Sequence, residues 1–187
     1  MKSILATLLL VIQATAFAAE PEIPPFPSVE FQTTEGTFVV ELDGPRAPIT
    51  VKNFVTYVND GFYDGTVFHR VIPGFMAQAG GFGTDLKEKG TRPPVANEAG
   101  NGLRNRRGTI AMARTGDPHS ATAQFYINLV NNENLDPHPR RWGYCVFGKV
   151  TKGMDVVNKI KSVDTTISMG HQDVPQEDVI IEKVEVS

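Results

Sequence analysis

One arginine stands out among the residues of this chain that could do chemistry. Arg70 lies in the segment 68–81 (FHRVIPGFMAQAGG), within a short apolar run that has the composition of a β-strand. A charged side chain there breaks the local pattern, as residues of functional sites often do. Because successive strand residues face opposite sides, Met76 and Gln78 share one face, and His69 points away from the side that Arg70 faces.

A second strand-like segment divides its residues between two faces in the same way. Phe125, Ile127 and Leu129 alternate with Gln124 and Tyr126. The first set is wholly apolar and is typical of a core. The glutamine and the aromatic ring are therefore expected on the opposite surface, available to a ligand.

The residues alone also leave a purely structural interpretation open. Arg70 could be an ion-pair partner, and Phe75, Met76 and Tyr126 could fill the core. Without further motifs this interpretation is preferred, because large apolar side chains are most often buried for packing.

The usual catalytic motifs are absent from the sequence. It has no nucleophile-elbow serine, phosphate loop or paired-histidine motif, so nothing indicates a hydrolase, a cofactor or a metal site. Residues 80–83 (GGFG) lack the lysine of a phosphate loop and predict a plain turn. Cys145 lies in an apolar run and is expected to be a small buried hydrophobe. Three histidines without ligand spacing are expected at the surface, namely His119, His138 and His171.

Four segments, in order and spacing, resemble the cyclophilins. They are residues 68–81, 108–114 (GTIAMAR), 124–128 (QFYIN) and 146–157 (VFGKVTKGMDVV). The chain looks most like the bacterial periplasmic branch, and the similarity covers almost all of residues 29–186. It implies a mainly β fold, a closed antiparallel β-barrel capped by two α-helices, and peptidyl-prolyl cis-trans isomerase activity that needs no cofactor or metal.

The resemblance also implies roles for individual residues. The family's catalytic arginine falls on Arg70. Its hydrophobic proline pocket falls on Phe75, Met76, Tyr126 and Leu135. Its polar substrate contacts fall on Gln78 and Gln124, and its backbone contacts on Ala113 and Arg114.

Four positions depart from the usual cyclophilin pattern. Tyr126 replaces a phenylalanine and adds a hydroxyl expected at the pocket rim, and Arg114 replaces an asparagine. Tyr144 stands where many members have a histidine, so its implied part in substrate binding is the weaker one. Asn134 occupies the place of a tryptophan with which many eukaryotic members hold cyclosporin, and Trp142 does not align with it. The sequence therefore predicts weak cyclosporin binding.

Composition and periodicity predict the elements that position these residues. The chain of 187 residues is 41% hydrophobic, which suits one domain with a sizeable core. Its 17 glycines and 13 prolines indicate a turn-rich, β-dominated fold. Helices are predicted over residues 48–61 and 154–160, and strands over 29–33, 37–42, 67–72, 75–79, 109–113, 124–129, 144–149 and 179–186. Many short strands with two helices are typical of a barrel or sandwich.

The N-terminal residues predict export. A lysine, an apolar run over residues 4–12 and small residues at 16 and 18 indicate a signal peptide over 1–18. Residues 19–27 hold four prolines and predict an extended linker before an isomerase domain over 28–187. With no glycosylation sequon and no ER-retention ending, the expected compartment is the bacterial periplasm, with secretion as the second choice.

Together these features predict an exported prolyl isomerase that assists protein folding. Its expected partners are unfolded or partly folded proline-containing polypeptides. The formal net charge of −3 argues against nucleic acid, and no membrane contact is expected after signal cleavage. The protein is expected to be a monomer. The alternative is a holdase chaperone or a proline-peptide binding module with little catalysis, because a fold alone does not fix an activity.

Overall fold

The computed structural model describes residues 23–187. The predicted signal peptide and the first part of the predicted linker therefore lie outside the described residues. The helices are α1 (Pro48–Asn59) and α2 (Met154–Lys161), with a short 3-10 helix, η1 (Glu133–Leu135). The strands are β1 (Ser28–Thr33), β2 (Gly36–Leu42), β3 (Thr66–Val67), β4 (Arg70–Ile72), β5 (Met76–Ala79), β6 (Thr109–Met112), β7 (Phe125–Asn128), β8 (Val146–Lys152), β9 (Thr165–Ser168), β10 (His171–Pro175) and β11 (Ile180–Val186).

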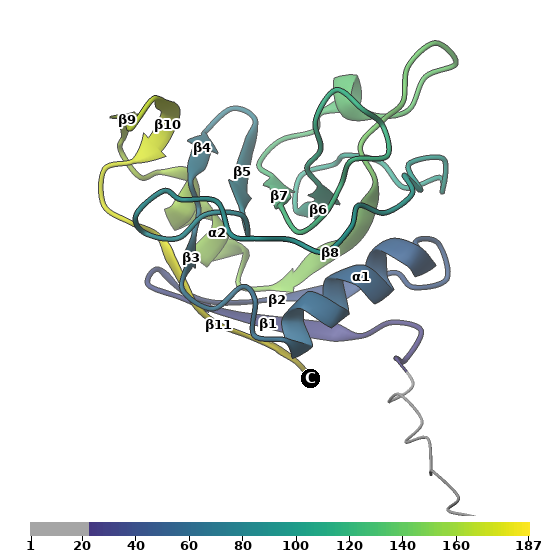
Figure 1. Ribbon diagram of the computed structural model, residues 1–187, viewed down its shortest axis with the longest axis horizontal. Coiled ribbons are helices and arrows are strands. Elements are labelled where there is room, and N and C mark those ends of the chain that lie inside the picture. The colour runs from purple at the N-terminus through teal and green to yellow at the C-terminus, as the bar shows by residue number, and fades with distance from the viewer. Residues whose placement is uncertain (1–22) are drawn as a thin grey trace, which may run out of the picture.

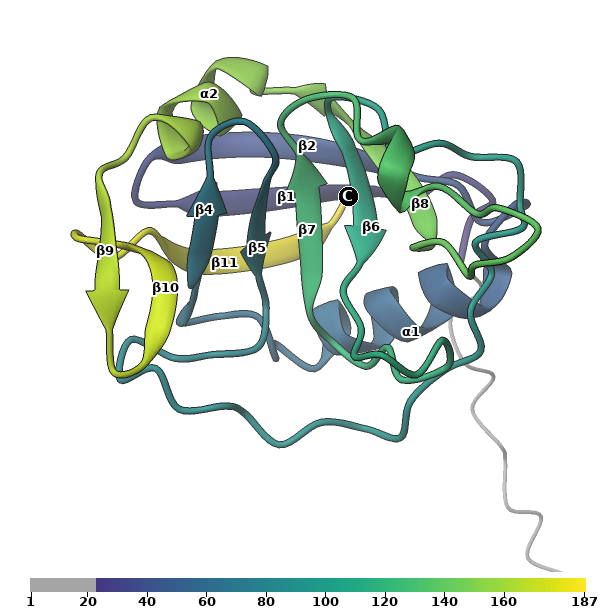
Figure 2. The ribbon, with the colours of Figure 1, turned by 90° about the horizontal axis from the view of Figure 1, so that it is seen from above.

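Nine of these strands form one antiparallel sheet that curls around a core (Figure 1). Their order is β3-β11-β1-β2-β8-β6-β7-β5-β4, and β9 and β10 form a separate hairpin. The two helices cover opposite ends of the curled sheet, and β4, β5, β7 and β6 lie side by side on one wall (Figure 2). The mainly β, two-helix fold predicted from the sequence is confirmed.

The predicted closure of the barrel is wrong. In the described residues β3 and β4 stand at the two ends of the sheet order and are not hydrogen-bonded to each other. The sequence predicts one strand over residues 67–72, but the chain crosses the open seam there. Thr66 and Val67 pair with β11, whereas Arg70 begins the pairing with β5, so Phe68 and His69 bridge the gap.

Aromatic side chains fill the space inside the curled sheet. Phe31 and Phe38, opposite each other in the β1–β2 hairpin, stack with ring centroids 4.7 Å apart. Phe54 of α1 packs 5.6 Å from Phe125 of β7 and 5.1 Å from Phe147 of β8. All five rings are fully buried, so the helix closes one end of the core.

Most element boundaries agree with the periodicity to within about two residues, which is the usual uncertainty at element ends. Pro48 begins α1, where its missing N–H has no partner to lose, and Gly61 follows the helix with φ +64°. The β9–β10 hairpin and η1 are not predicted by the sequence pattern. Within residues 23–187 no helix is long and apolar enough to cross a membrane.

Candidate active site

The candidate site is built on a single row of paired residues across the sheet. Arg70 of β4 pairs with Gln78 of β5, Gln78 pairs with Tyr126 of β7, and Tyr126 pairs with Ala111 of β6. Paired residues of neighbouring strands project from the same face. The face opposite the core therefore presents a guanidinium, an amide and an aromatic ring side by side, as the alternation of the sequence predicts.

A cavity of about 140 Å³ lies on this face. It is lined by nine residues, namely Arg70, Phe75, Met76, Gln78, Ala113, Arg114, Tyr126, Leu135 and Tyr144. Drug-sized ligands occupy pockets of roughly 300–1,000 Å³, so this cavity has room for one small group only. Beneath it Met76 and Tyr126 pack with Ala111 and Val146 in a small cluster separate from the main core.

Arg70 lies at the edge of the cavity with its side chain 44% exposed. Its Nε donates to Oδ2 of Asp173 in β10, at 3.4 Å. The backbone of Asp173 has φ +60°, a left-handed conformation that non-glycine residues rarely adopt. The β9–β10 hairpin packs against β4, so a segment a hundred residues away supplies the arginine's acceptor.

A pair of amides continues the polar edge of the cavity. Gln78 Nε2 donates to Oε1 of Gln124 at 2.9 Å, and Gln124 Nε2 donates to Oε1 of Glu88 at 3.3 Å. Gln124 does not itself line the cavity but accepts the hydrogen bond of Gln78, which does. It lies against Gly81, where an added Cβ would collide with its side chain. The glycine thus permits the close approach of the two segments.

Arg114 contributes its side chain, and not only its backbone, to the wall of the cavity. Its guanidinium lies 4.3 Å from the ring centroid of Tyr144. It also donates to the carbonyl oxygens of Thr115 and Trp142, at 2.9 and 3.0 Å. This cation–π contact and the hydrogen bonds hold the loop before β8 against the cavity, which places Tyr144 among its lining residues.

The hydroxyl of Tyr126 does not lie at the pocket rim, contrary to the expectation from the sequence. It is buried and donates to Oδ1 of Asn105 at 2.8 Å. Asn105 is itself 1% exposed, and its backbone N–H and Nδ2 both donate to Oδ1 of Asp136, at 2.7 and 3.1 Å. Burial raises the pKa of Tyr126 well above its ordinary value, so the hydroxyl stays protonated.

His69, next to Arg70 in the chain, is buried on the other side, as the alternation predicts. It is 6% exposed and packs against Phe82 with ring centroids 4.6 Å apart. Its Nδ1 has no hydrogen-bond partner among the described residues. Burial lowers the pKa of His69 to about 4, so the imidazole is neutral near pH 7.

The other titratable residues singled out in the sequence lie apart from the cavity. His119 and His138 are exposed as expected, whereas His171 is only half-exposed and packs against Phe82. Cys145 is 4% exposed and burial raises its pKa to about 11, which keeps the thiol protonated. No three His, Cys, Asp or Glu side chains in residues 23–187 could together hold a metal ion.

The structure brings nine of the ten predicted site residues around one cavity, and the tenth, Gln124, is hydrogen-bonded to Gln78 in its lining. Asn134, where the sequence predicts weak cyclosporin binding, is exposed on η1 and does not line the cavity. Sequence reasoning missed Asp173 and Asn105. A signal for Asn105 was present, because a buried tyrosine needs an acceptor for its hydroxyl.

Comparisons with known proteins identify the family. The model of the cyclophilin type peptidyl-prolyl cis-trans isomerase/CLD family matches residues 28–186. The chain is 51% identical over 185 residues to peptidyl-prolyl cis-trans isomerase A of Dickeya dadantii, covering 99% of this chain and 97% of that protein. It is 57% identical over 162 residues to peptidyl-prolyl cis-trans isomerase B of Escherichia coli, covering 85% of this chain and 99% of that protein.

Solved structures support the same assignment. A cyclophilin-type isomerase of Cryptosporidium parvum superposes with a TM-score of 0.73 at 25% identity, covering 87% of this chain and 98% of that one. The fold, the whole-domain match to the family and the high identity to named isomerases agree. The chain therefore belongs to the cyclophilin family and is a cyclophilin-type peptidyl-prolyl cis-trans isomerase.

Proposed function

We propose that this isomerase accelerates rotation about X-Pro bonds in proteins that fold after export, and that Arg70 is its catalytic residue. The Arg70 guanidinium donates a hydrogen bond to the prolyl nitrogen in the twisted transition state. The cavity bounded by Phe75, Met76, Tyr126 and Leu135 holds the proline ring meanwhile. The substrates are unfolded or partly folded proline-containing polypeptides.

The chemistry of the X-Pro bond explains why an arginine suits this role. Conjugation of the nitrogen lone pair with the carbonyl sets a rotation barrier of about 18–20 kcal/mol. The twisted transition state loses that conjugation, and its nitrogen becomes pyramidal and accepts a hydrogen bond. A fixed donor at that position binds the transition state more tightly than either ground state, which is what accelerates the reaction. Arginine is permanently charged and its planar group is pre-organised.

One observation carries this proposal: Arg70 lines the same small cavity as the apolar side chains of Phe75, Met76 and Leu135, and it lies on the same row as Gln78 and Tyr126. The ion pair with Asp173 limits the positions that the guanidinium can take. A second structure of the Cryptosporidium protein, with a TM-score of 0.75, was determined in the presence of the dipeptide Ala-Pro. That ligand has the chemistry that we propose for the cavity.

Replacement of Arg70 tests the catalytic role. Removal of one pre-organised donor typically lowers the rate by a factor of about 10²–10³, so Arg70→Ala should lose nearly all isomerisation of a short proline peptide. Arg46→Ala is the matched control, because Arg46 also pairs with an aspartate, Asp43, but does not line the cavity. A wild-type rate in Arg70→Ala would refute the role of the arginine.

A chaperone function without catalysis makes a different prediction in the same variants. Suppression of the aggregation of an unfolded protein should then be equal in the wild type and in Arg70→Ala, and neither should isomerise the peptide. Loss of isomerisation in the variant alone supports the enzyme.

We also propose that residues 1–18 direct the chain to the bacterial periplasm, where it acts as a monomer. The lysine, the apolar run and the small residues at 16 and 18 support the export. A mature N-terminus at Ala19 in a periplasmic extract is the expected result, together with the mass of one chain in light scattering. Uncut protein in the cytosol would contradict export, and a dimer mass would contradict the oligomeric state.

A further inference from the structure

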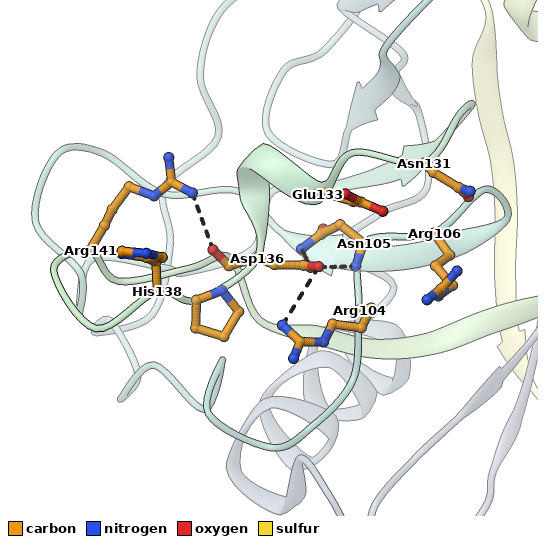
Figure 3. A pocket seen from close by; sticks show the side chains of 9 residues that line it. Arg104, Asn105, Arg106, Asn131, Glu133, Asp136, His138 and Arg141 are labelled. Carbon is orange, nitrogen blue, oxygen red and sulfur yellow. Dashed lines mark hydrogen bonds and ion pairs between the residues drawn. The ribbon is translucent and has the colours of Figure 1, made fainter.

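A second cavity lies directly beside the proposed proline pocket. Its volume is about 320 Å³, and its wall carries the arginines Arg104, Arg106 and Arg141 with Glu133, Asp136 and His138 (Figure 3). The two cavities are neighbours in the fold, because Leu135 lines the first and the next residue, Asp136, lines the second. Asn105 also lines the second cavity and accepts the hydrogen bond of Tyr126 from the first.

The carboxylate of Asp136 is already paired with other residues that line the cavity. Its Oδ1 accepts two hydrogen bonds from Asn105, and its Oδ2 lies 3.7 Å from Nη1 of Arg104. Figure 3 shows Asp136 between Asn105, Arg104 and Arg141. Since Asp136 is buried and already has these partners, it is not free to neutralise the remaining arginines.

Most of the guanidinium donors of this cavity remain available. The guanidinium of Arg141 donates one hydrogen bond, from Nη2 to the backbone oxygen of Asp136 at 3.3 Å. Arg106 is exposed, and no side chain in residues 23–187 forms a hydrogen bond or ion pair with its guanidinium. Three arginines against two carboxylates leave an excess of positive charge here, although the whole chain carries a net charge of −3.

Guanidinium groups recognise carboxylates through paired N–H donors, more specifically than a point charge does. A polypeptide whose proline occupies the first cavity continues on both sides of that residue, and an extended chain advances about 3.3 Å per residue. A cavity lined by the residue next to Leu135 is therefore within reach of a side chain a few residues from the proline.

We propose that the second cavity is a subsite for an acidic side chain, aspartate or glutamate, of the same polypeptide whose proline is being isomerised. One of the two available guanidinium groups, that of Arg106 or that of Arg141 on the opposite side of Asp136 (Figure 3), binds its carboxylate, and Arg104 holds Asp136 in the wall. The proposal rests on the proposed function, because it takes the first cavity as the proline site. It predicts that the enzyme prefers prolines with an acidic residue at a fixed distance along the chain.

Paired peptides test this preference. Each pair carries one proline in an alanine-rich sequence, with glutamate in one member and glutamine in the other, at one position from four residues before to four residues after the proline. An exposed charge pair contributes little, so one arginine should raise kcat/KM of the glutamate peptide by about 1.4- to fivefold at the correct position. About 1 M NaCl, where the screening length is about 3 Å, should abolish the difference.

The double variant Arg106→Gln with Arg141→Gln should bring the glutamate-to-glutamine ratio to about one. The matched control is Arg107→Gln with Arg140→Gln, which removes the same charge from adjacent positions that do not line the cavity. Arg107 instead donates to Asn158 Oδ1 at 2.9 Å. The control should keep the wild-type ratio, and melting temperatures should show that both variants are folded.

The outcomes separate this proposal from the function it rests on. A ratio near one at every position in the wild type overturns the subsite, and so does an equal loss of the ratio in the control variant. Isomerisation of the glutamine peptides reports the proposed function independently. If no peptide is isomerised, calorimetric titration of the same pairs measures the preference as a ratio of dissociation constants, and equal constants overturn the subsite.

Discussion

The two faces of strand β7 differ in what their side chains do. On the inner face Phe125 and Ile127 are fully buried and belong to the main apolar core. On the outer face Tyr126 borders the candidate proline pocket, and Asn128 donates to Asn105 and to Thr109. One face stabilises the curled sheet by burial, and the other borders a small cavity lined by both apolar and polar side chains. Substitutions on the outer face should therefore leave the packing of the core intact.

The largest expected effect comes from the inner face. Phe125 packs against Phe31, Phe54 and Tyr63 with ring centroids 5.5–5.6 Å apart. Phe125→Ala should lower the free energy of unfolding by about 3–5 kcal/mol, because it leaves a large cavity in a packed core. Urea unfolding measures this loss. A loss below about 1 kcal/mol would show that the inner face does not dominate stability.

Next in size is the effect of acid on His69. In the unfolded chain a histidine titrates near pH 6.5, whereas burial lowers the pKa of His69 to about 4 in the folded chain. Between these values the unfolded chain binds the additional proton, so the folded state loses up to about 3 kcal/mol as the pH falls from 7 to below 4.

The variant His69→Leu removes this contribution and keeps an apolar group in the buried site. Its free energy of unfolding should therefore depend less on pH between 7 and 4 than that of the wild type. Urea unfolding at several pH values measures both curves. Parallel curves for the two proteins would contradict a buried, neutral histidine.

A smaller effect is expected for Tyr126→Phe, which keeps the ring and removes the hydroxyl. Because that hydroxyl is buried on Asn105 and does not face the pocket, the variant should lose about 1 kcal/mol of stability. Its kcat/KM on a proline peptide should change little. A large loss of kcat/KM without a loss of stability would place the hydroxyl in substrate binding instead.

The smallest expected effect concerns the positioning of Arg70 by Asp173. The pair is partly exposed, with side chains 44% and 36% accessible, so it should contribute less than about 1 kcal/mol to stability. Asp173→Asn is the conservative change, since asparagine tolerates a left-handed backbone. We expect kcat to fall by about two- to fivefold with KM nearly unchanged, as for a residue that orients the catalytic group.

The variant Asp173→Glu keeps the negative charge at this position and should retain more of kcat than Asp173→Asn does. Equal losses in the two variants, together with equal losses of stability, would indicate a structural role for the hairpin alone.

Local pattern was enough to predict much of this arrangement. The alternation over residues 124–129 separated Phe125 from Tyr126 correctly, and the helical spacing after Pro48 located α1. It failed at residues 67–72, where the strand breaks because its two halves pair with different partners, β11 and β5. Strand pairing depends on contacts across the whole sheet. The apolar run over residues 67–72 therefore does not by itself predict the break.

By itself the sequence determined which residues are apolar, which face each strand residue takes and, through four ordered motifs, the family and the ten candidate site residues. These follow from the chain's chemistry and from periodicity, which act over a few residues. The tertiary structure decided that Asp173 is the acceptor for Arg70, 103 positions away, and that Asn105 accepts the hydroxyl of Tyr126. Only folding brings these polar groups together, because each needs a partner once burial removes water.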